Sequence, residues 1–151
     1  MARFQYSMQS ILDIKLKMET LAKQEFSAAR SALDEEERRL EALYRRKNMY
    51  ETEAERLRSG VLNIREIEEN KNAILCMDEY IVRQKGQVVI AERKLEKARE
   101  QLQVVMMERK THETLKEKAF EEFLMEEKKK ESKEVDELTS YVYGQHGNED
   151  A

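Results

Sequence analysis

The sequence predicts an all-α protein: a long antiparallel two-helix coiled coil, or hairpin, with an overhanging C-terminal helix. Three observations support this fold. The 151 residues include no proline and 40% of them are charged, a composition typical of long helices. Apolar residues recur in steps of three and four along most of the chain. A helix stop is followed at once by a helix start near residue 60. The length suits a single domain, residues 1–151.

The first helix is expected over about residues 3–58. Its apolar positions define one face, called the seam, along which a coiled-coil helix contacts its partner. Two successive steps of four, from Met18 to Ala22 to Phe26, predict that the supercoil unwinds locally. The predicted seam positions are Phe4, Met8, Ile11, Lys15, Met18, Ala22, Phe26, Ala29, Leu33, Glu36, Leu40, Leu43, Lys47, Tyr50, Ala54 and Leu57.

A turn is expected over residues 59–62. Gly60 comes directly after the last periodic residues, where glycine commonly ends a helix because it adopts the left-handed conformation at little cost. Asn63 is followed three residues later by Glu66, a spacing that approximates the capping box of a new helix.

The second helix is expected over about residues 63–143, followed by a frayed tail at 144–151. Every seventh residue from Ile67 to Leu102 is aliphatic, which predicts a sustained coiled-coil heptad. The series is Ile67, Ile74, Ile81, Val88, Leu95 and Leu102.

A hairpin requires the two seams to meet in antiparallel register, and they do so when paired residue numbers sum to 120 or 121. Glu36 then faces Gln84, and Lys47 lays its methylene stem on Ile74 with its ammonium in water. A parallel homodimer would instead place Lys47 against Lys47 and Glu36 against Glu36, so the hairpin is favoured. Other predicted pairs are Leu43 with Met77, Leu40 with Ile81, Leu33 with Val88, and Phe26 with Leu95.

The two helices are predicted to differ in length. Phe4 is expected opposite residues near 116, so the second helix has no partner in this chain from about Lys118 onward. An uncovered apolar stripe on such an overhang indicates either self-association or a different partner molecule. The stripe comprises Phe120, Phe123, Leu124, Val135, Leu138 and Val142.

Composition also excludes several classes of function. The net charge of −4, with both signs interleaved, argues against nucleic-acid binding. Cys76 is the only cysteine, so no internal disulfide forms. No apolar run approaches the ~20 residues of a membrane span, and the N-terminus lacks a secretory signal, so we expect a soluble cytoplasmic protein. No phosphate loop or metal-ligand spacing is present, and we expect no enzymatic activity, no cofactor and no small-molecule substrate.

The opening "FQYSMQSILDIKLKMETLAKQEF" resembles the start of FliJ-type proteins of the bacterial flagellar type III export apparatus. The matching features are Phe4, Tyr6, the Met8-Gln9-Ser10 step, Ile11 and the Leu12-Asp13-Ile14-Lys15 segment. The late segment "LKEKAFEEFLMEEKKKESKEVDEL" is similar to the C-terminal stretch of the family, and the resemblance covers nearly the whole chain.

This resemblance implies a coiled coil similar to the central stalk of rotary ATPases. Such a stalk inserts its terminal end into the hexameric flagellar export ATPase ring, contacts the cytoplasmic domain of the export gate membrane protein, and escorts export chaperones. It would be cytoplasmic and associated peripherally with the inner face of the membrane at the flagellar base. The residues assigned to the ATPase ring are Phe4, Ile11, Lys15, Phe120, Phe123, Leu124 and Leu138.

The same resemblance places the export-gate contact on the half of the hairpin near the turn. Leu43, Tyr50 and Met77 also fall on the predicted seam, so packing explains them equally well, whereas Arg46 and Tyr80 lie off the seam. The assigned gate residues are Arg39, Leu43, Arg46, Tyr50, Ala73, Met77, Tyr80 and Gln84.

Three alternatives stay open from sequence. The chain could be the equivalent stalk of a virulence type III secretion system, although the N-terminal motif favours the flagellar version. It could be a structural scaffold that self-associates through the overhang. It could also act as an export chaperone by itself, which requires selective binding of secreted subunits.

Overall fold

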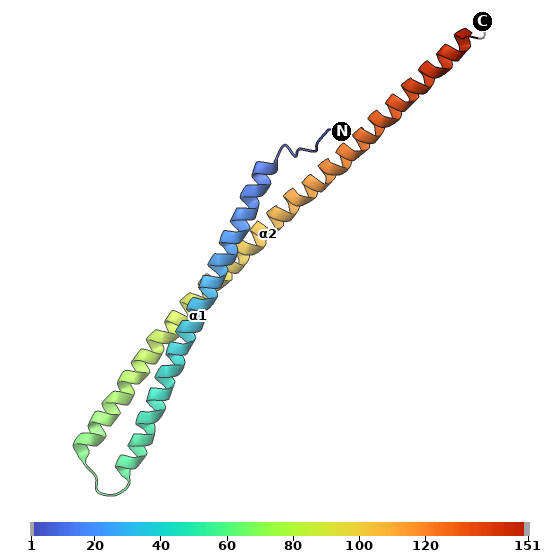
Figure 1. The fold of residues 1–151 in the computed structure, drawn as a ribbon. Coiled ribbons are helices and arrows are strands. Elements are labelled where there is room, and N and C mark those ends of the chain that lie inside the picture. The colour runs from blue at the N-terminus through green and yellow to red at the C-terminus, as the bar shows by residue number, and fades with distance from the viewer. Residues whose placement is uncertain (1, 150–151) are drawn as a thin grey trace. The chain divides into compact units, whose positions relative to one another are not determined.

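The computed structural model describes residues 2–149, and the described chain forms two helices and no strand (Figure 1). Helix α1 spans Gln9–Arg58 and helix α2 spans Ile64–Glu149. The chain divides into two compact units: unit 1 comprises Met1–Glu19 with Val105–Ala151, and unit 2 comprises Thr20–Val104. In each unit a segment of α1 packs antiparallel on a segment of α2. The predicted all-α helical hairpin is confirmed.

The helix boundaries differ from the predicted ones at both ends of the chain. α1 begins at Gln9 rather than near residue 3: residues 2–6 have no regular secondary structure, and Ser7 and Met8 form a single turn before the helix. α2 continues to Glu149 rather than ending near residue 143. Gly144 and Gly147 do not end it, since Gly60 is the only described glycine with a positive φ. Residues 150 and 151 of the predicted tail lie outside the described residues.

The turn between the helices forms as the sequence predicts. Gly60 has a φ of 96°, a conformation that side-chain-bearing residues rarely adopt. The Oδ1 of Asn63 accepts hydrogen bonds from the backbone N–H groups of Arg65, at 3.2 Å, and Glu66, at 3.4 Å. Asn63 is therefore the N-cap of α2, and it satisfies donors that the first helical turn leaves without a partner.

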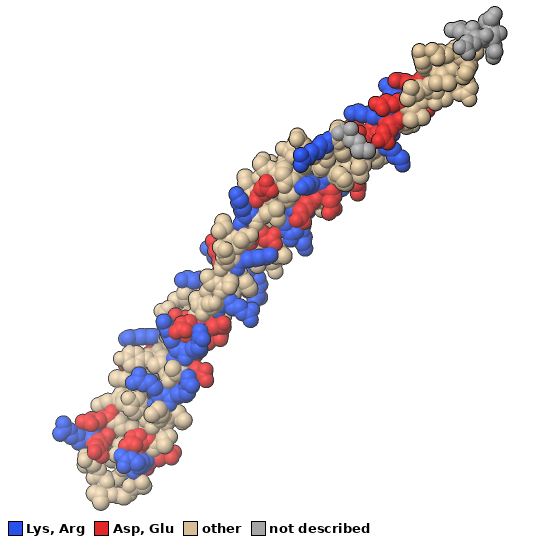
Figure 2. All heavy atoms as spheres, viewed as in Figure 1, with Lys and Arg blue, Asp and Glu red and all other residues tan. Residues whose placement is uncertain are grey.

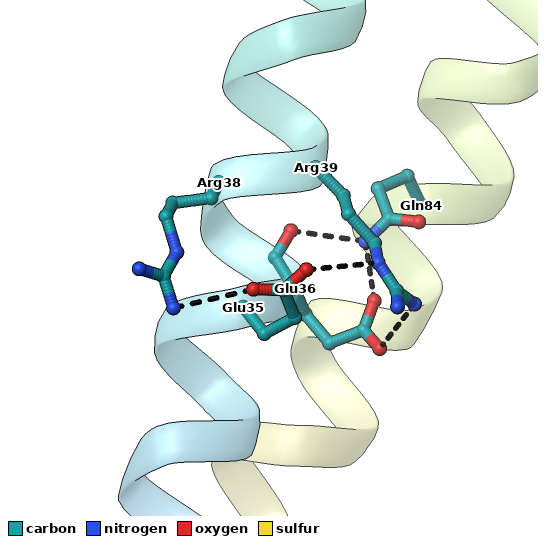
Figure 3. A network of polar contacts seen from close by, with 5 residues as sticks. All are labelled: Glu35, Glu36, Arg38, Arg39 and Gln84. Carbon is teal, nitrogen blue, oxygen red and sulfur yellow. Dashed lines mark hydrogen bonds and ion pairs between the residues drawn. The ribbon is translucent and has the colours of Figure 1, made fainter.

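Unit 2 contains the hairpin in the predicted register. Asn70 Nδ2 donates to the backbone carbonyl of Tyr50 at 2.9 Å, and these residue numbers sum to 120. Gln84 Nε2 donates to the backbone carbonyl of Glu36 at 2.9 Å and also to its carboxylate. Figure 3 shows Gln84 reaching across to Glu36 from the neighbouring helix. These polar contacts hold two amide side chains inside the seam, where an unpaired polar group would be costly.

One predicted layer of unit 2 differs in detail. The ammonium of Lys47 does not stay in water alone, because its Nζ lies 2.7 Å from the Asp78 carboxylate and 3.8 Å from that of Glu51. The hydrogen bond to Asp78 raises the pKa of Lys47 above its ordinary value. The seam positions of unit 2 are otherwise buried or half-buried in both helices, with Ala54, Met77, Ile81 and Ala91 among the most buried.

The seam of α1 within unit 1 is not the predicted one. Leu12 and Glu19 are buried and Lys15 is half-buried, whereas Ile11 and Met18 are exposed. With Leu12, Lys15 and Glu19 as seam positions, the alternation of threes and fours continues without the two successive fours, so the predicted unwinding insertion is wrong. The prediction failed because the seam was assigned from apolar residues only. That criterion selects Met18 and rejects its neighbour Glu19, which is the residue that is buried.

Candidate interaction surfaces

An aromatic cluster in unit 1 joins the segment before α1 to α2. The ring of Phe4 lies 5.1 Å from that of Phe120, in an edge-on arrangement, and 5.4 Å from that of Phe123. Both geometries are favourable for aromatic pairs. Phe4 was predicted opposite residues near 116. It reaches farther along α2 because the non-helical chain before Gln9 covers up to ~3.3 Å per residue, against ~1.5 Å in a helix.

The uncovered part of α2 consequently begins later than the predicted Lys118. Phe123 and Glu127 are still half-buried, and every residue from 128 to 147 is exposed. Residues 138–147 include no Lys, Arg, Asp or Glu, and four large side chains of this segment are exposed: Leu138, Tyr141, Val142 and Tyr143. A helical segment without charges that exposes aromatic and aliphatic side chains is a typical interaction surface.

Charge is distributed differently over the rest of the visible face. Figure 2 shows Lys and Arg side chains interleaved with Asp and Glu side chains rather than gathered in separate patches. Many of these form pairs one helical turn apart, such as Arg65 with Glu69 at 3.4 Å and Arg99 with Glu96 at 3.6 Å. Such exposed pairs contribute little stability.

Ion pairs of Lys15 and of Arg109 join α1 to α2 within the described residues of unit 1. Lys15 Nζ lies 2.9 Å from Glu108 Oε2. Arg109 Nε donates to the carboxylate of the buried Glu19, and Arg109 Nη1 donates to Glu113 Oε2 at 2.8 Å. The hydrogen bond to Glu19, together with the one to Glu113, raises the pKa of Arg109. Sequence reasoning missed Glu19 and Arg109; the available signal was that Glu19 continues the alternation of threes and fours.

The structure brings together only part of the predicted ATPase-ring set. Phe4, Phe120 and Phe123 form the aromatic cluster, and Lys15 is engaged by Glu108. The remaining members lie in unit 1 with exposed side chains: Ile11, Leu124 and Leu138. The predicted set omitted Tyr141 and Tyr143, which are exposed beside Leu138 and Val142.

The predicted gate residues all belong to unit 2, and they differ in accessibility. Met77 is buried; Leu43, Tyr50, Ala73 and Gln84 are half-buried in or beside the seam. Arg39, Arg46 and Tyr80 are exposed. Arg39 pairs with Glu35 at 3.5 Å and with Glu36 at 3.3 Å, in the network that Figure 3 shows. Arg46 and Tyr80 therefore present the most accessible side chains of this set.

Residues 2–149 contain no group of three or more His, Cys, Asp or Glu side chains arranged to hold a metal ion. Neither helix has, within these residues, a stretch both long and apolar enough to cross a membrane.

Comparison with known proteins decides the family. Residues 4–148 match the family model described as "Flagellar FliJ protein". The chain belongs to the FliJ family. This membership places it among the proteins of flagellar type III export. No curated protein matches the chain.

A solved structure confirms the fold of this FliJ-family chain. The structure is that of a Chlamydia trachomatis protein described as a YscO homologue. It matches this chain with a TM-score of 0.74 and 23% sequence identity. The match covers 97% of this chain and 99% of the other. At this identity the likeness concerns the fold.

Proposed function

We propose that this FliJ-family protein is a non-enzymatic stalk whose unit 1 docks into the hexameric flagellar export ATPase ring and promotes ring assembly and energy coupling. The observation that carries the proposal is the uncovered end of α2. Its residues 128–147 are exposed, and the last ten of them are uncharged. A helix that leaves Leu138, Tyr141 and Tyr143 in water gains stability when a surrounding protein covers them.

The test is a chain truncated after Glu127. This variant keeps Phe120 and Phe123, so the aromatic cluster with Phe4 is preserved. We expect it to lose stimulation of the cognate export ATPase and the promotion of hexamers, while circular dichroism shows that the remaining helices persist. The control is Val61→Ser at the turn, where a fully exposed apolar residue is replaced in unit 2. Full stimulation by the truncated chain would contradict the proposal.

A second contact, with the cytoplasmic domain of the export gate membrane protein, is proposed for unit 2. Arg46 and Tyr80 are the sharpest probes, because both are exposed and their replacement leaves the seam intact. Arg46→Ala and Tyr80→Ala should each weaken binding to that domain without lowering the midpoint of urea unfolding. Undiminished binding by the double variant would remove these residues from the contact.

Binding to export chaperones, and a location in the cytoplasm at the inner face of the membrane near the flagellar base, complete the proposal. Both are supported by family membership. Pull-down of each export chaperone with the purified chain tests the first, and fluorescence co-localisation with basal bodies tests the second.

The stalk of a virulence type III system is the second candidate, and it is supported by the likeness in fold to the protein described as a YscO homologue. The two are separated by measuring which purified ATPase the chain stimulates. Sedimentation equilibrium separates both from a self-associating scaffold: a monomer fits a stalk, and a stable dimer fits a scaffold.

A further inference from the structure

The first turns of α1 carry two faces that could pack on α2. One face contains Leu12 and Glu19; the other, predicted from the apolar pattern, contains Ile11 and Met18, and Lys15 belongs to both. Leu12 and Glu19 are 4% and 7% exposed, whereas Ile11 and Met18 are each 37% exposed. Unit 1 therefore buries a carboxylate and leaves two large apolar side chains partly in water.

Burial of apolar surface by itself favours the opposite arrangement. Removing isoleucine and methionine side chains from water is favourable, and removing a carboxylate from water is unfavourable unless it is paired. Ile11 precedes Leu12 and Met18 precedes Glu19, so each residue of one face lies about 100° around the helix from its counterpart on the other. A rotation of the first turns of α1 by about a quarter turn would exchange the two faces.

The group that reverses this preference lies on α2. Arg109 Nε donates to the Glu19 carboxylate, and Arg109 Nη1 donates to Glu113 at 2.8 Å, so one guanidinium connects carboxylates of both helices. The planar fork of arginine suits such contacts. If Glu19 turned outward, Arg109 would be left mostly buried beside Met18, and losing one partner of a buried pair is strongly unfavourable. The hydrogen bond to Glu19 also raises the pKa of Arg109.

We infer that the Glu19–Arg109 ion pair selects which face of α1 packs on α2, holding Leu12 in the seam and keeping Ile11 and Met18 outside it. Arg109 therefore acts as a positioning residue: through Glu19 it determines that Ile11 and Met18 lie on the face of α1 directed away from α2. The inference concerns the packing of the isolated chain and does not depend on the proposed docking into an ATPase ring.

Thiol labelling tests the inference. In a Cys76→Ser background, which removes the only native thiol, the reporters Leu12→Cys and Met18→Cys are introduced separately. With Arg109 present, the reporter at position 18 should react faster than the reporter at position 12. Arg109→Leu should invert the ratio of the two rates, since the Glu19 carboxylate then loses its contact with the guanidinium on α2 and position 18 can face an apolar neighbour.

A rescue and a control make the result specific. Adding Glu19→Leu to Arg109→Leu should restore the original ratio without the ion pair between positions 19 and 109, because leucine at position 19 makes the original face apolar. Lys47→Met, which removes an interhelical ion pair of unit 2, should leave the ratio unchanged.

Two outcomes would overturn the inference. If the ratio keeps its original order in Arg109→Leu, the pair does not select the face. If both reporters become fast, the pair only holds the helices together. Should Arg109→Leu lose helical structure, Glu19→Gln provides a milder substitution. It is expected to lower the ratio of the rate at position 18 to the rate at position 12. An unchanged ratio in Glu19→Gln also overturns the inference.

Discussion

Replacing Phe4 with alanine is expected to release the chain segment that precedes α1. In the structure the Phe4 ring contacts Phe120 and Phe123, with centroid distances of 5.1 and 5.4 Å. Aromatic pairs contribute about 0.5–1.5 kcal/mol each, so losing both costs about 1–3 kcal/mol. This free energy corresponds to a shift of about 5- to 150-fold from the docked toward the released segment, since ~1.4 kcal/mol is tenfold.

Hydrogen exchange at the Gln9 amide measures this shift. The Gln9 N–H donates to the Tyr6 carbonyl at 3.1 Å, so the amide is protected only while the preceding segment stays in place. Its protection factor should fall by the same about 5- to 150-fold in Phe4→Ala. Tyr143→Ala, which removes an exposed aromatic ring from the same unit, is the control and should leave the factor unchanged. Equal protection at Gln9 in Phe4→Ala and the unsubstituted chain would refute the argument.

Three further predictions concern unit 2. Ile81→Ala should lower the free energy of unfolding in urea by about 2–5 kcal/mol, because Ile81 is 5% exposed, whereas Val82→Ala at its 70% exposed neighbour should change it by no more than ~0.5 kcal/mol. Gly60→Ala should destabilise by at least ~0.4–1 kcal/mol in the same assay, because alanine is strained at a φ of 96°; an unchanged midpoint would contradict the turn. The hydrogen bond to Asp78 raises the pKa of Lys47 above 10.5, so its stabilisation is complete below that pH and declines as pH rises through the folded-state pKa. Lys47→Met should reduce this alkaline loss of stability, measured as the thermal midpoint between pH 9 and 12.

The accuracy of the sequence predictions differs between the two units. In unit 2 the turn at Gly60, the cap at Asn63 and the contact of Gln84 with Glu36 were all predicted and are all present. They were predictable because the turn and the cap depend on neighbouring residues, and because a short connection leaves one antiparallel register that matches both heptads.

In unit 1 two local assumptions failed. The residues before Gln9 are not helical, so counting residues from the turn placed Phe4 too near the turn along α2. Glu19 is buried although it is charged, and the apolar pattern therefore selected Met18 in its place. The same limit applies to the predicted interaction residues. The sequence shows that Leu124 and Leu138 are apolar, but whether they are exposed depends on how far along α2 the segment that contains Phe4 reaches.

The residues alone determined the helical class, the position of the hairpin turn and the register of unit 2, because helix propensity, capping and heptad spacing act over a few residues and repeat. Tertiary packing decided which face of α1 is buried in unit 1 and which part of α2 is left uncovered. The reason is that the cost of burying a glutamate depends on the partner it meets, and Arg109, 90 residues away in the chain, supplies that partner only in the folded protein.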